Sequence, residues 1–217
     1  MWPRVRSSLP APPAVVVELG CGSIGGFVPA LLADGYPALG VDPDAPEGSS
    51  YRRLEFERSE LPPGLDAVVA SVSLHHVADP GEVLDQVADA LKPGGVVIVL
   101  EWDWESFDEP SARWSFERLD LAAEPKGWLH RGREHWLASG LPWETYLRDW
   151  ATGHGLHSAR RLVEALDERF ERVSCERGAY LFPELARTSE ADELQAIEAG
   201  VIRALRIDYL GRRSPTA

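Results

Sequence analysis

Two groups of residues in the first half of the chain could do chemistry. The first is a glycine-rich turn in the segment VVVELGCGSIGG, where Gly20 and Gly22 follow a run of apolar residues. Glycines at this spacing let the backbone turn sharply and approach a ligand closely, because no side chain fills the space. Such a turn between a strand and a helix is typical of a site for a nucleotide-like cofactor.

An acidic residue follows this turn at a spacing that suits a ribose. Asp42 ends the segment ALGVD, seventeen residues beyond Gly25. A carboxylate at the end of a second strand can accept hydrogen bonds from both ribose hydroxyls. Asp44 is the competing candidate, and a turn-forming role for Asp42 before Pro43 is the alternative. The order of strand, glycine turn, helix, strand and acid favours the ribose role for Asp42.

The second group is a histidine pair, His75 and His76, which directly follows the apolar run DAVVASVS. If that run is a strand of a parallel sheet, the pair lies at the carboxyl edge beside the glycine turn. A neutral imidazole there can take a proton from a nucleophile, so both residues are candidate general bases. The alternative is that one of them is simply packed beneath a neighbouring segment.

The later histidines do not predict a metal site. Their spacing does not place a ligand set on one helical face, and no zinc motif is matched. We therefore expect no metal from the group His130, Glu134, His135, His154 and His157.

Short β-branched runs alternate with helical stretches from Ala14 to Glu101, a pattern that predicts a parallel sheet covered by helices. The run VVIVL is apolar at every position and indicates a central strand. Strands are expected at Ala14 to Leu19, Ala38 to Val41, Tyr51 to Phe56, Ala67 to Ser71, Val96 to Leu100, Arg172 to Phe182 and Ile207 to Leu210. Helices are expected at Phe27 to Asp34, from the cap Asp79 to Leu91, after the cap Ser158, and at Ala191 to Leu205.

Length and charge restrict the function classes. The 217 residues suffice for one domain with an insert, and a net charge of −13 argues against a nucleic-acid partner. No apolar run is long enough to cross a membrane and the first residues lack the apolar core of a secretion signal, so we expect a cytoplasmic protein. The preference for Arg over Lys suggests a GC-rich bacterial genome. Cys21 and Cys175 are expected to be free thiols.

The chain changes character at Trp102, because seven of its eight tryptophans lie between Trp102 and Trp150. We expect a cofactor-binding half at residues 1–101, a helical insert at 102–157 that covers the substrate, and a C-terminal part at 158–217 that completes the sheet. A small aromatic core is the alternative role for the insert. Aromatic walls with acids such as Glu101, Asp103 and Glu105 would suit a planar or cationic small molecule.

Several motifs occur in one order along residues 15–101: ELGCG at 18–22, GVD at 40–42, ERSELP at 57–62, DAVVASVSLHHV at 66–77 and LKPGG at 91–95. In this combination the sequence resembles the class I S-adenosylmethionine-dependent methyltransferases. The resemblance implies a doubly wound, Rossmann-like α/β fold whose mostly parallel sheet has seven strands with the last antiparallel. It also implies S-adenosylmethionine as cofactor and methyl transfer to a small organic acceptor.

The resemblance assigns a role to each matching position. It implies that the turn Gly20–Cys21–Gly22 lies against the methionine part of the cofactor, with Glu18 beneath it and Asp42 on the ribose. Glu57 would stand where the family often has an Asp that reaches the adenine amino group. The backbone carbonyls of Ser71 and Val72 would approach the ammonium group of the cofactor.

One departure from the family pattern keeps a second interpretation open. Ser23 and Ile24 separate Gly22 from Gly25, which gives the spacing G-x-G-x-x-G of dinucleotide-binding proteins. Glu18 and the segments LHHV and LKPGG favour the methyltransferase. A dinucleotide-dependent oxidoreductase and a non-catalytic cofactor-binding protein of the same fold remain the alternatives.

Overall fold

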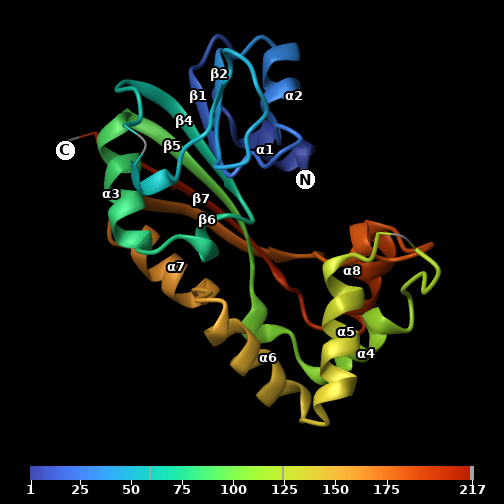
Figure 1. Cartoon of the computed structure of the whole chain (residues 1–217). Helices are drawn as coiled ribbons and strands as arrows, with labels where there is room; N and C mark the ends of the chain where they lie inside the picture. Colours follow the sequence, from blue (N-terminus) through green and yellow to red (C-terminus); the bar gives the residue numbers. More distant parts are fainter. Residues whose placement is uncertain (59, 124, 216–217) are drawn as a thin grey trace. The chain divides into compact units, whose positions relative to one another are not determined.

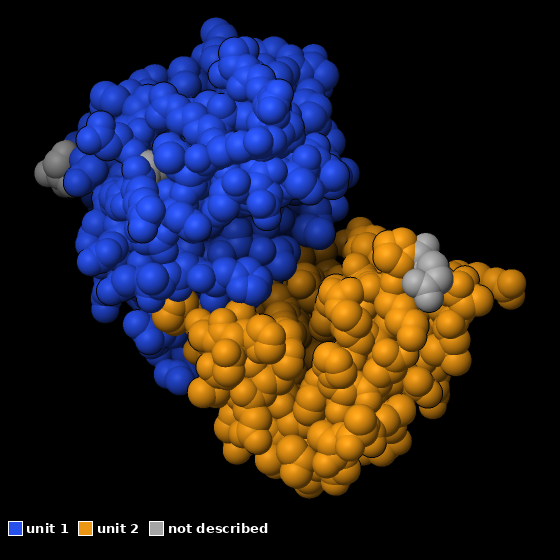
Figure 2. Space-filling model, in the orientation of Figure 1, with its two compact units in different colours: residues 1–101, 160–176, 208–217 blue, residues 102–159, 177–207 orange. Residues whose placement is uncertain are grey.

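The chain forms two units in the computed structural model, which describes residues 1–58, 60–123 and 125–215 (Figure 1). Unit 1, blue in Figure 2, comprises residues 1–101, 160–176 and 208–217. Unit 2, orange in Figure 2, comprises residues 102–159 and 177–207. The boundary after Glu101 coincides with the change in tryptophan content. The C-terminal part was expected to complete the sheet over its whole length. In the structure, residues 177–207 of that part belong to unit 2, together with the insert.

Unit 1 is built on a seven-stranded sheet with the order β3-β2-β1-β4-β5-β7-β6. Neighbouring strands from β3 to β5 are parallel. This arrangement confirms the doubly wound α/β fold expected from the alternating strands and helices. The strands are β1 Val16–Leu19, β2 Ala38–Val41, β3 Tyr51–Arg52, β4 Leu65–Ser71, β5 Leu91–Trp102, β6 Glu171–Gly178 and β7 Arg206–Arg212.

The last strand runs antiparallel to its neighbour, as expected. At one end of the pair, Gly94 N donates to Arg213 O and Arg213 N donates to Gly95 O. At the other end, Asp103 N donates to Leu205 O. As the residue number rises along β5, the residue number of its partner in β7 falls. This is the register of an antiparallel pair.

Helices cover both faces of the sheet in unit 1. Figure 1 shows α1 Trp2–Ser8 and α2 Val28–Ala33 on one side, and α3 Pro80–Ala90 and α7 Ala159–Asp167 on the other. The inner strands are buried on both faces, which explains why their sequences are apolar at nearly every position. One face forms a buried cluster to which strands β1, β4 and β5 contribute alternate residues.

Local signals fix the ends of most elements. Asp79 caps α3 by accepting a hydrogen bond from Gly81 N at 2.7 Å, and Pro80 occupies the first turn. Several expected elements were too long, among them the strand at Arg172 to Phe182, which ends at Gly178. Strand β3 ends at Arg52, because Phe56 belongs instead to the 3-10 helix η1 Phe56–Arg58. The helix expected at Ala191 to Leu205 is α8 Glu190–Glu198, and Gly200 follows it with a φ of 69°.

Unit 2 is mainly helical, and its tryptophans pack together. Trp102, Trp136 and Trp143 lie in a buried apolar cluster, and four more tryptophans pack against it while remaining partly exposed. The insert therefore has an aromatic core of its own. Its elements are η3 Trp104–Ser106, α4 Glu109–Phe116, α5 Trp128–Ser139, α6 Trp143–Gly153, η4 Phe182–Glu184 and α8.

Among the described residues, no helix is both long and apolar enough to span a membrane.

Candidate functional site

The glycine turn begins where β1 ends, and a serine from another loop presses against it. Gly20 has a φ of 85°, and a Cβ at this position would lie 2.2 Å from the Cβ of Ser73. The Ser73 hydroxyl donates to Leu19 O at 2.9 Å. Only glycine fits here, because both the backbone conformation and the space exclude a side chain. Ser73 was not among the expected site residues, because this contact joins segments far apart in the sequence.

Glu18 lies beneath the turn and is fully buried. Its Oε2 accepts hydrogen bonds from Phe27 N at 2.7 Å and Val28 N at 3.1 Å, two backbone donors at the start of α2. A Cβ on Gly26 would lie 2.3 Å from Glu18 Oε1. Burial raises the pKa of Glu18 to about 7, opposed by these two backbone donors. Glu18 thus fixes the backbone of the loop where it enters α2.

Asp42 ties the glycine turn to the end of β2. Its Oδ2 accepts from Gly22 N at 2.9 Å, and its Oδ1 accepts from Asp44 N at 2.8 Å. A Cβ on Gly22 would have no atom within 4 Å, so the backbone of the turn borders open space at this point. A carboxylate has about four lone-pair positions, so Asp42 retains acceptor capacity for a ligand. Asp44 is exposed and lies farther along the same turn.

The glycine loop packs against the side chain of Tyr51 at Gly25. Gly25 has a φ of 86°, and a Cβ there would lie 2.4 Å from the hydroxyl oxygen of Tyr51. The ring of Tyr51 would also lie 3.0 Å from a Cβ on Gly40. The loop therefore passes closely over the Tyr51 side chain. Tyr51 was expected only as the first residue of a strand, without a contact to the loop.

Cys21 lies between the two glycines and points into the protein. Its side chain is buried, and a Cβ on Gly40 would lie 2.9 Å from its sulfur atom. Burial, with the nearby carboxylates of Glu18 and Asp42, raises the pKa of the Cys21 thiol to about 12. Cys21 can therefore offer a ligand its backbone only. Cys175 is exposed on β6, and both cysteines are free thiols, as expected.

The end of β4 contains a backbone conformation that is rare for its residue type. Val72 follows Ser71, the last residue of β4, and has a φ of 54°. A β-branched residue in the left-handed region is strained by about 1–3 kcal/mol. The hydrogen bond from Val72 N to Leu100 O, at 2.7 Å, helps to hold this geometry. Strain of this kind collects at ligand sites, and here it redirects the chain at the carboxyl edge of the sheet.

Glu57 is half-buried in η1 and connects two loops. Its Oε1 accepts a hydrogen bond from Ala78 N at 2.8 Å. This contact joins the segment after β3 to the segment that carries the histidine pair. Glu57 therefore lies on the same side of unit 1 as the loop after β4.

The two histidines occupy different environments in η2 Leu74–His76. His75 is buried, and its Nδ1 lies 2.6 Å from Glu101 Oε2, whereas His76 is exposed. Glu101 Oε1 accepts from Ser73 N at 2.9 Å and Leu74 N at 2.7 Å. One carboxylate thus fixes both the loop backbone and the orientation of the His75 ring. The centroids of the two histidine rings are 4.0 Å apart.

A family model described as a methyltransferase domain matches residues 3–170. The chain belongs to this family. The match includes the glycine turn, Asp42, the histidine pair and the whole of α5 and α6. It confirms the resemblance on which the class I assignment was based and disfavours the dinucleotide-binding interpretation.

Relatives of this methyltransferase-domain protein resemble it over part of their length. The 2-ketoarginine methyltransferase of Streptomyces arginensis is 35% identical over 166 residues, which are 67% of this chain and 48% of that protein. The human thiol S-methyltransferase TMT1B is 30% identical over 144 residues, 56% of each chain. The chain therefore spans about half the length of these curated relatives.

Solved structures agree with the fold over nearly the whole chain. An S-adenosylmethionine-dependent methyltransferase from Mesorhizobium loti has a TM-score of 0.59 and 21% identity, covering 98% of this chain and 97% of that one. At this level of identity the likeness shows the fold of the methyltransferase-domain protein.

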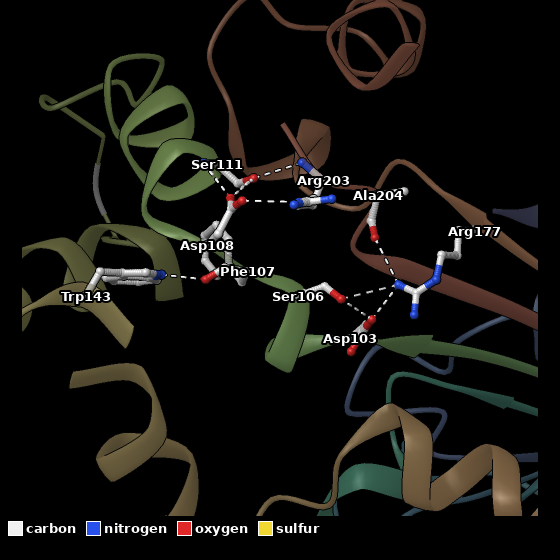
Figure 3. Close-up of polar contacts among 9 residues, drawn as sticks. All are labelled: Asp103, Ser106, Phe107, Asp108, Ser111, Trp143, Arg177, Arg203 and Ala204. Atoms are coloured by element: carbon white, nitrogen blue, oxygen red, sulfur yellow. Dashed lines mark hydrogen bonds and ion pairs between the residues drawn. The ribbon is translucent and has the colours of Figure 1, made fainter. Parts of the chain in front are cut away.

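The acids expected to line the insert are used in other ways. Figure 3 shows Asp103, which is buried, accepting hydrogen bonds from Arg177 and from the hydroxyl of Ser106. Glu101 binds the backbone of the loop after β4. Glu105 lines a second cavity with Glu144 and Arg148, which shares Phe107 and Leu147 with the aromatic cavity of unit 2. Among the described residues no carboxylate lines the aromatic cavity, and the expectation of a planar or cationic acceptor stays a prediction.

The same close-up shows how the start of the insert is held. Asp108 caps α4 by accepting from Ser111 N at 3.0 Å, and its other oxygen accepts from Arg203 Nε at 3.3 Å (Figure 3). Trp143 Nε1 donates to Phe107 O at 2.5 Å. These bonds fix the Trp143 side chain and the backbone around Phe107 in unit 2.

The described residues contain no group of three or more His, Cys, Asp or Glu side chains arranged to hold a metal ion.

Proposed function

We propose that the chain transfers a methyl group from S-adenosylmethionine to a small organic acceptor. The observation that carries the proposal is the glycine turn of a methyltransferase-domain protein with open space at Gly22, beside a carboxylate that retains acceptor capacity. The cofactor would supply a methyl group already activated by a positively charged sulfur. The protein then has to orient the acceptor and exclude water.

The residues of unit 1 fit such a cofactor in the following way. The backbone of Gly20–Cys21–Gly22 would lie against its methionine part, and Asp42 would hold the ribose hydroxyls. Glu57 would reach toward the adenine amino group. The carbonyls of Ser71 and Val72 would face its ammonium group, and Glu18 would act beneath the loop by fixing the backbone.

We also propose a base for acceptors that must lose a proton. Glu101 keeps the proton of the neutral His75 ring on Nδ1, so that Nε2 is the atom that accepts a proton. Burial of His75 shields the imidazole from water. His76 is exposed and has the weaker claim to this role.

The direct test is calorimetric titration of the protein with S-adenosylmethionine, S-adenosylhomocysteine and NADH. We expect binding of the first two and none of NADH. Binding of NADH alone would revive the oxidoreductase. Tight binding of S-adenosylmethionine without turnover across a broad set of acceptors would instead favour a non-catalytic role.

The base is tested by a pair of conservative variants. We expect His75→Gln to lower the rate of methyl transfer by roughly a hundredfold at saturating substrates, since general-base catalysis contributes about 10²- to 10⁴-fold. A glutamine amide can still donate to Glu101, so cofactor affinity should hardly change. His76→Gln is the matched control and should retain its rate. Equal rates in both variants would leave alignment alone as the mechanism.

A further inference from the structure

Unit 2 contains an aromatic cavity of about 230 Å³, which none of the roles assigned so far uses. Its apolar wall consists of Leu147 and six aromatic side chains: Trp102, Phe107, Trp128, Trp143, Tyr146 and Trp150. Small-molecule sites in proteins are usually concave and lined in this way, with volumes of about 300 to 1,000 Å³. A cavity slightly below that range suits a ligand of one or two rings.

Two helices build the cavity with matching faces. On α5, the lining residues Trp128, Arg131, Gly132 and His135 fall on one helical face, and α6 presents a corresponding face from Trp143 to His154. Residues at such spacing ordinarily fill a core. Here the two faces leave a space between them.

Gly132 accounts for part of that space. It lies in the interior of α5, where glycine is less favourable than alanine by about 0.8–1 kcal/mol. Its φ is not in the left-handed region, and a Cβ at this position would have no atom within 4 Å outside the helix's own backbone. Neither conformation nor crowding requires a glycine here. The effect of the missing side chain is an open place in the cavity wall.

Arg131 also lines the cavity, and no carboxylate among the described residues lines it. Arg131 donates to Lys126 O, and within the described part of the chain it forms no ion pair. Arg113 and Arg177 of unit 2 pair with Glu109 and Asp103, whereas Arg131, like Arg133 and Arg148, forms no ion pair among the described residues. The exposed Arg131 lies at the edge of the apolar wall, where its guanidinium can bind an anionic ligand group.

We propose that this cavity binds a flat aromatic carboxylate, with the ring between the aromatic side chains and the carboxylate on Arg131. The proposal rests on the proposed function, in which this molecule is the methyl acceptor or resembles it. A single guanidinium matches a carboxylate in charge and in bidentate geometry. His135 lines the same cavity and can donate a further hydrogen bond to the anion.

The test compares ligands that share a ring and differ in charge. Calorimetric titration with 2-naphthoate, 2-naphthamide and 2-naphthylmethylammonium should give the tightest binding for 2-naphthoate. We expect about ten- to hundredfold weaker binding of the amide, since it loses charge-assisted hydrogen bonds. Equal or tighter binding of the ammonium compound would overturn the proposal, as would the absence of binding by all three.

Variants locate the binding. Arg131→Gln should reduce the affinity for 2-naphthoate to that for the amide, without changing the affinity for the amide. Gly132→Leu should abolish binding of both by filling the cavity. Arg133→Gln, on the same helix but lining another cavity, is the matched control and should behave like the unmodified chain. Binding of 2-naphthoate that is insensitive to Arg131→Gln would refute the site.

A parallel titration with S-adenosylmethionine separates the two proposals. If the chain binds S-adenosylmethionine but shows no Arg131-dependent carboxylate binding, only the cavity assignment fails. If it binds 2-naphthoate through Arg131 but does not bind S-adenosylmethionine, the cavity assignment stands and the proposed function fails. Phenyl phosphate that binds more than tenfold tighter than benzoate, with the same dependence on Arg131, would show that the ligand class is wrong.

Discussion

The glycine turn of unit 1 and the aromatic cavity of unit 2 are built in opposite ways. The turn consists of backbone, held by the carboxylates of Glu18 and Asp42, which accept two backbone N–H groups each. The cavity consists of side chains on two helices, and its most open place is a missing side chain at Gly132. A site made of backbone tolerates few substitutions, whereas a site made of side chains can change its ligand through single substitutions. This difference suits a common cofactor and a variable acceptor.

The largest effect on the difference between the two sites is expected from a substitution at Gly22. A valine at Gly22 should weaken S-adenosylmethionine binding by at least about a thousandfold, or about 4 kcal/mol, because its side chain would fill the open space beside the turn. Gly94→Val is the control, since Gly94 also has a positive φ and no atom within 4 Å of a Cβ. Both variants carry similar backbone strain. If calorimetry finds the same affinity in both, the turn does not contact the cofactor.

The second prediction concerns pH and the buried carboxylate of Glu18. Its pKa is raised from 4.5 to about 7, so the folded chain binds more protons than the unfolded chain between these values. The free energy of unfolding should therefore fall as pH rises through this window, by about 3 kcal/mol in total from this residue. Denaturant unfolding from about pH 5 to about pH 8 measures the effect. In Glu18→Gln the free energy of unfolding should fall less over this pH range, and the difference from the unmodified chain should equal that amount. An equal fall in both proteins would contradict the raised pKa of Glu18.

Asp42 should have a smaller effect, confined to the cofactor. Asp42→Ala removes the acceptor for Gly22 N and the proposed ribose contacts, so the affinity for S-adenosylmethionine should fall about ten- to hundredfold. Asp42→Asn keeps one oxygen for Gly22 and should lose less. Asp44→Ala is the control in the same turn. A loss confined to Asp44→Ala would transfer the ribose role to that residue.

Gly132 should give the smallest effect, and it should have the opposite sign. Gly132→Ala should raise the free energy of unfolding by about 0.5–1 kcal/mol, because the helix gains a better helix former without a clash. Gly22→Ala should lower it, because of the positive φ at that position. Thermal or denaturant unfolding of the two variants would decide. Destabilisation by Gly132→Ala would mean that this glycine is needed for packing rather than for space.

The sequence predicted unit 1 far better than unit 2. Strand β2 was predicted residue for residue, and Asp79 and Pro80 marked the start of α3, because these signals are local. The contacts of Ser73 with Gly20 and of Tyr51 with Gly25 could not be predicted, since they join residues that only the folded sheet brings together. In unit 2 the tryptophans indicated an aromatic core, but spacing alone could not show that one helical face would stay open at Gly132.

The contrast between the two cysteines has a practical consequence for studying this protein. Cys21 is buried with a pKa raised to about 12, so at neutral pH it carries almost no thiolate and resists alkylation. Cys175 is exposed on β6. A maleimide dye should therefore attach to the native chain at one position, without removal of any cysteine. The dye would place a fluorescent label on unit 1 while the glycine turn remains chemically untouched.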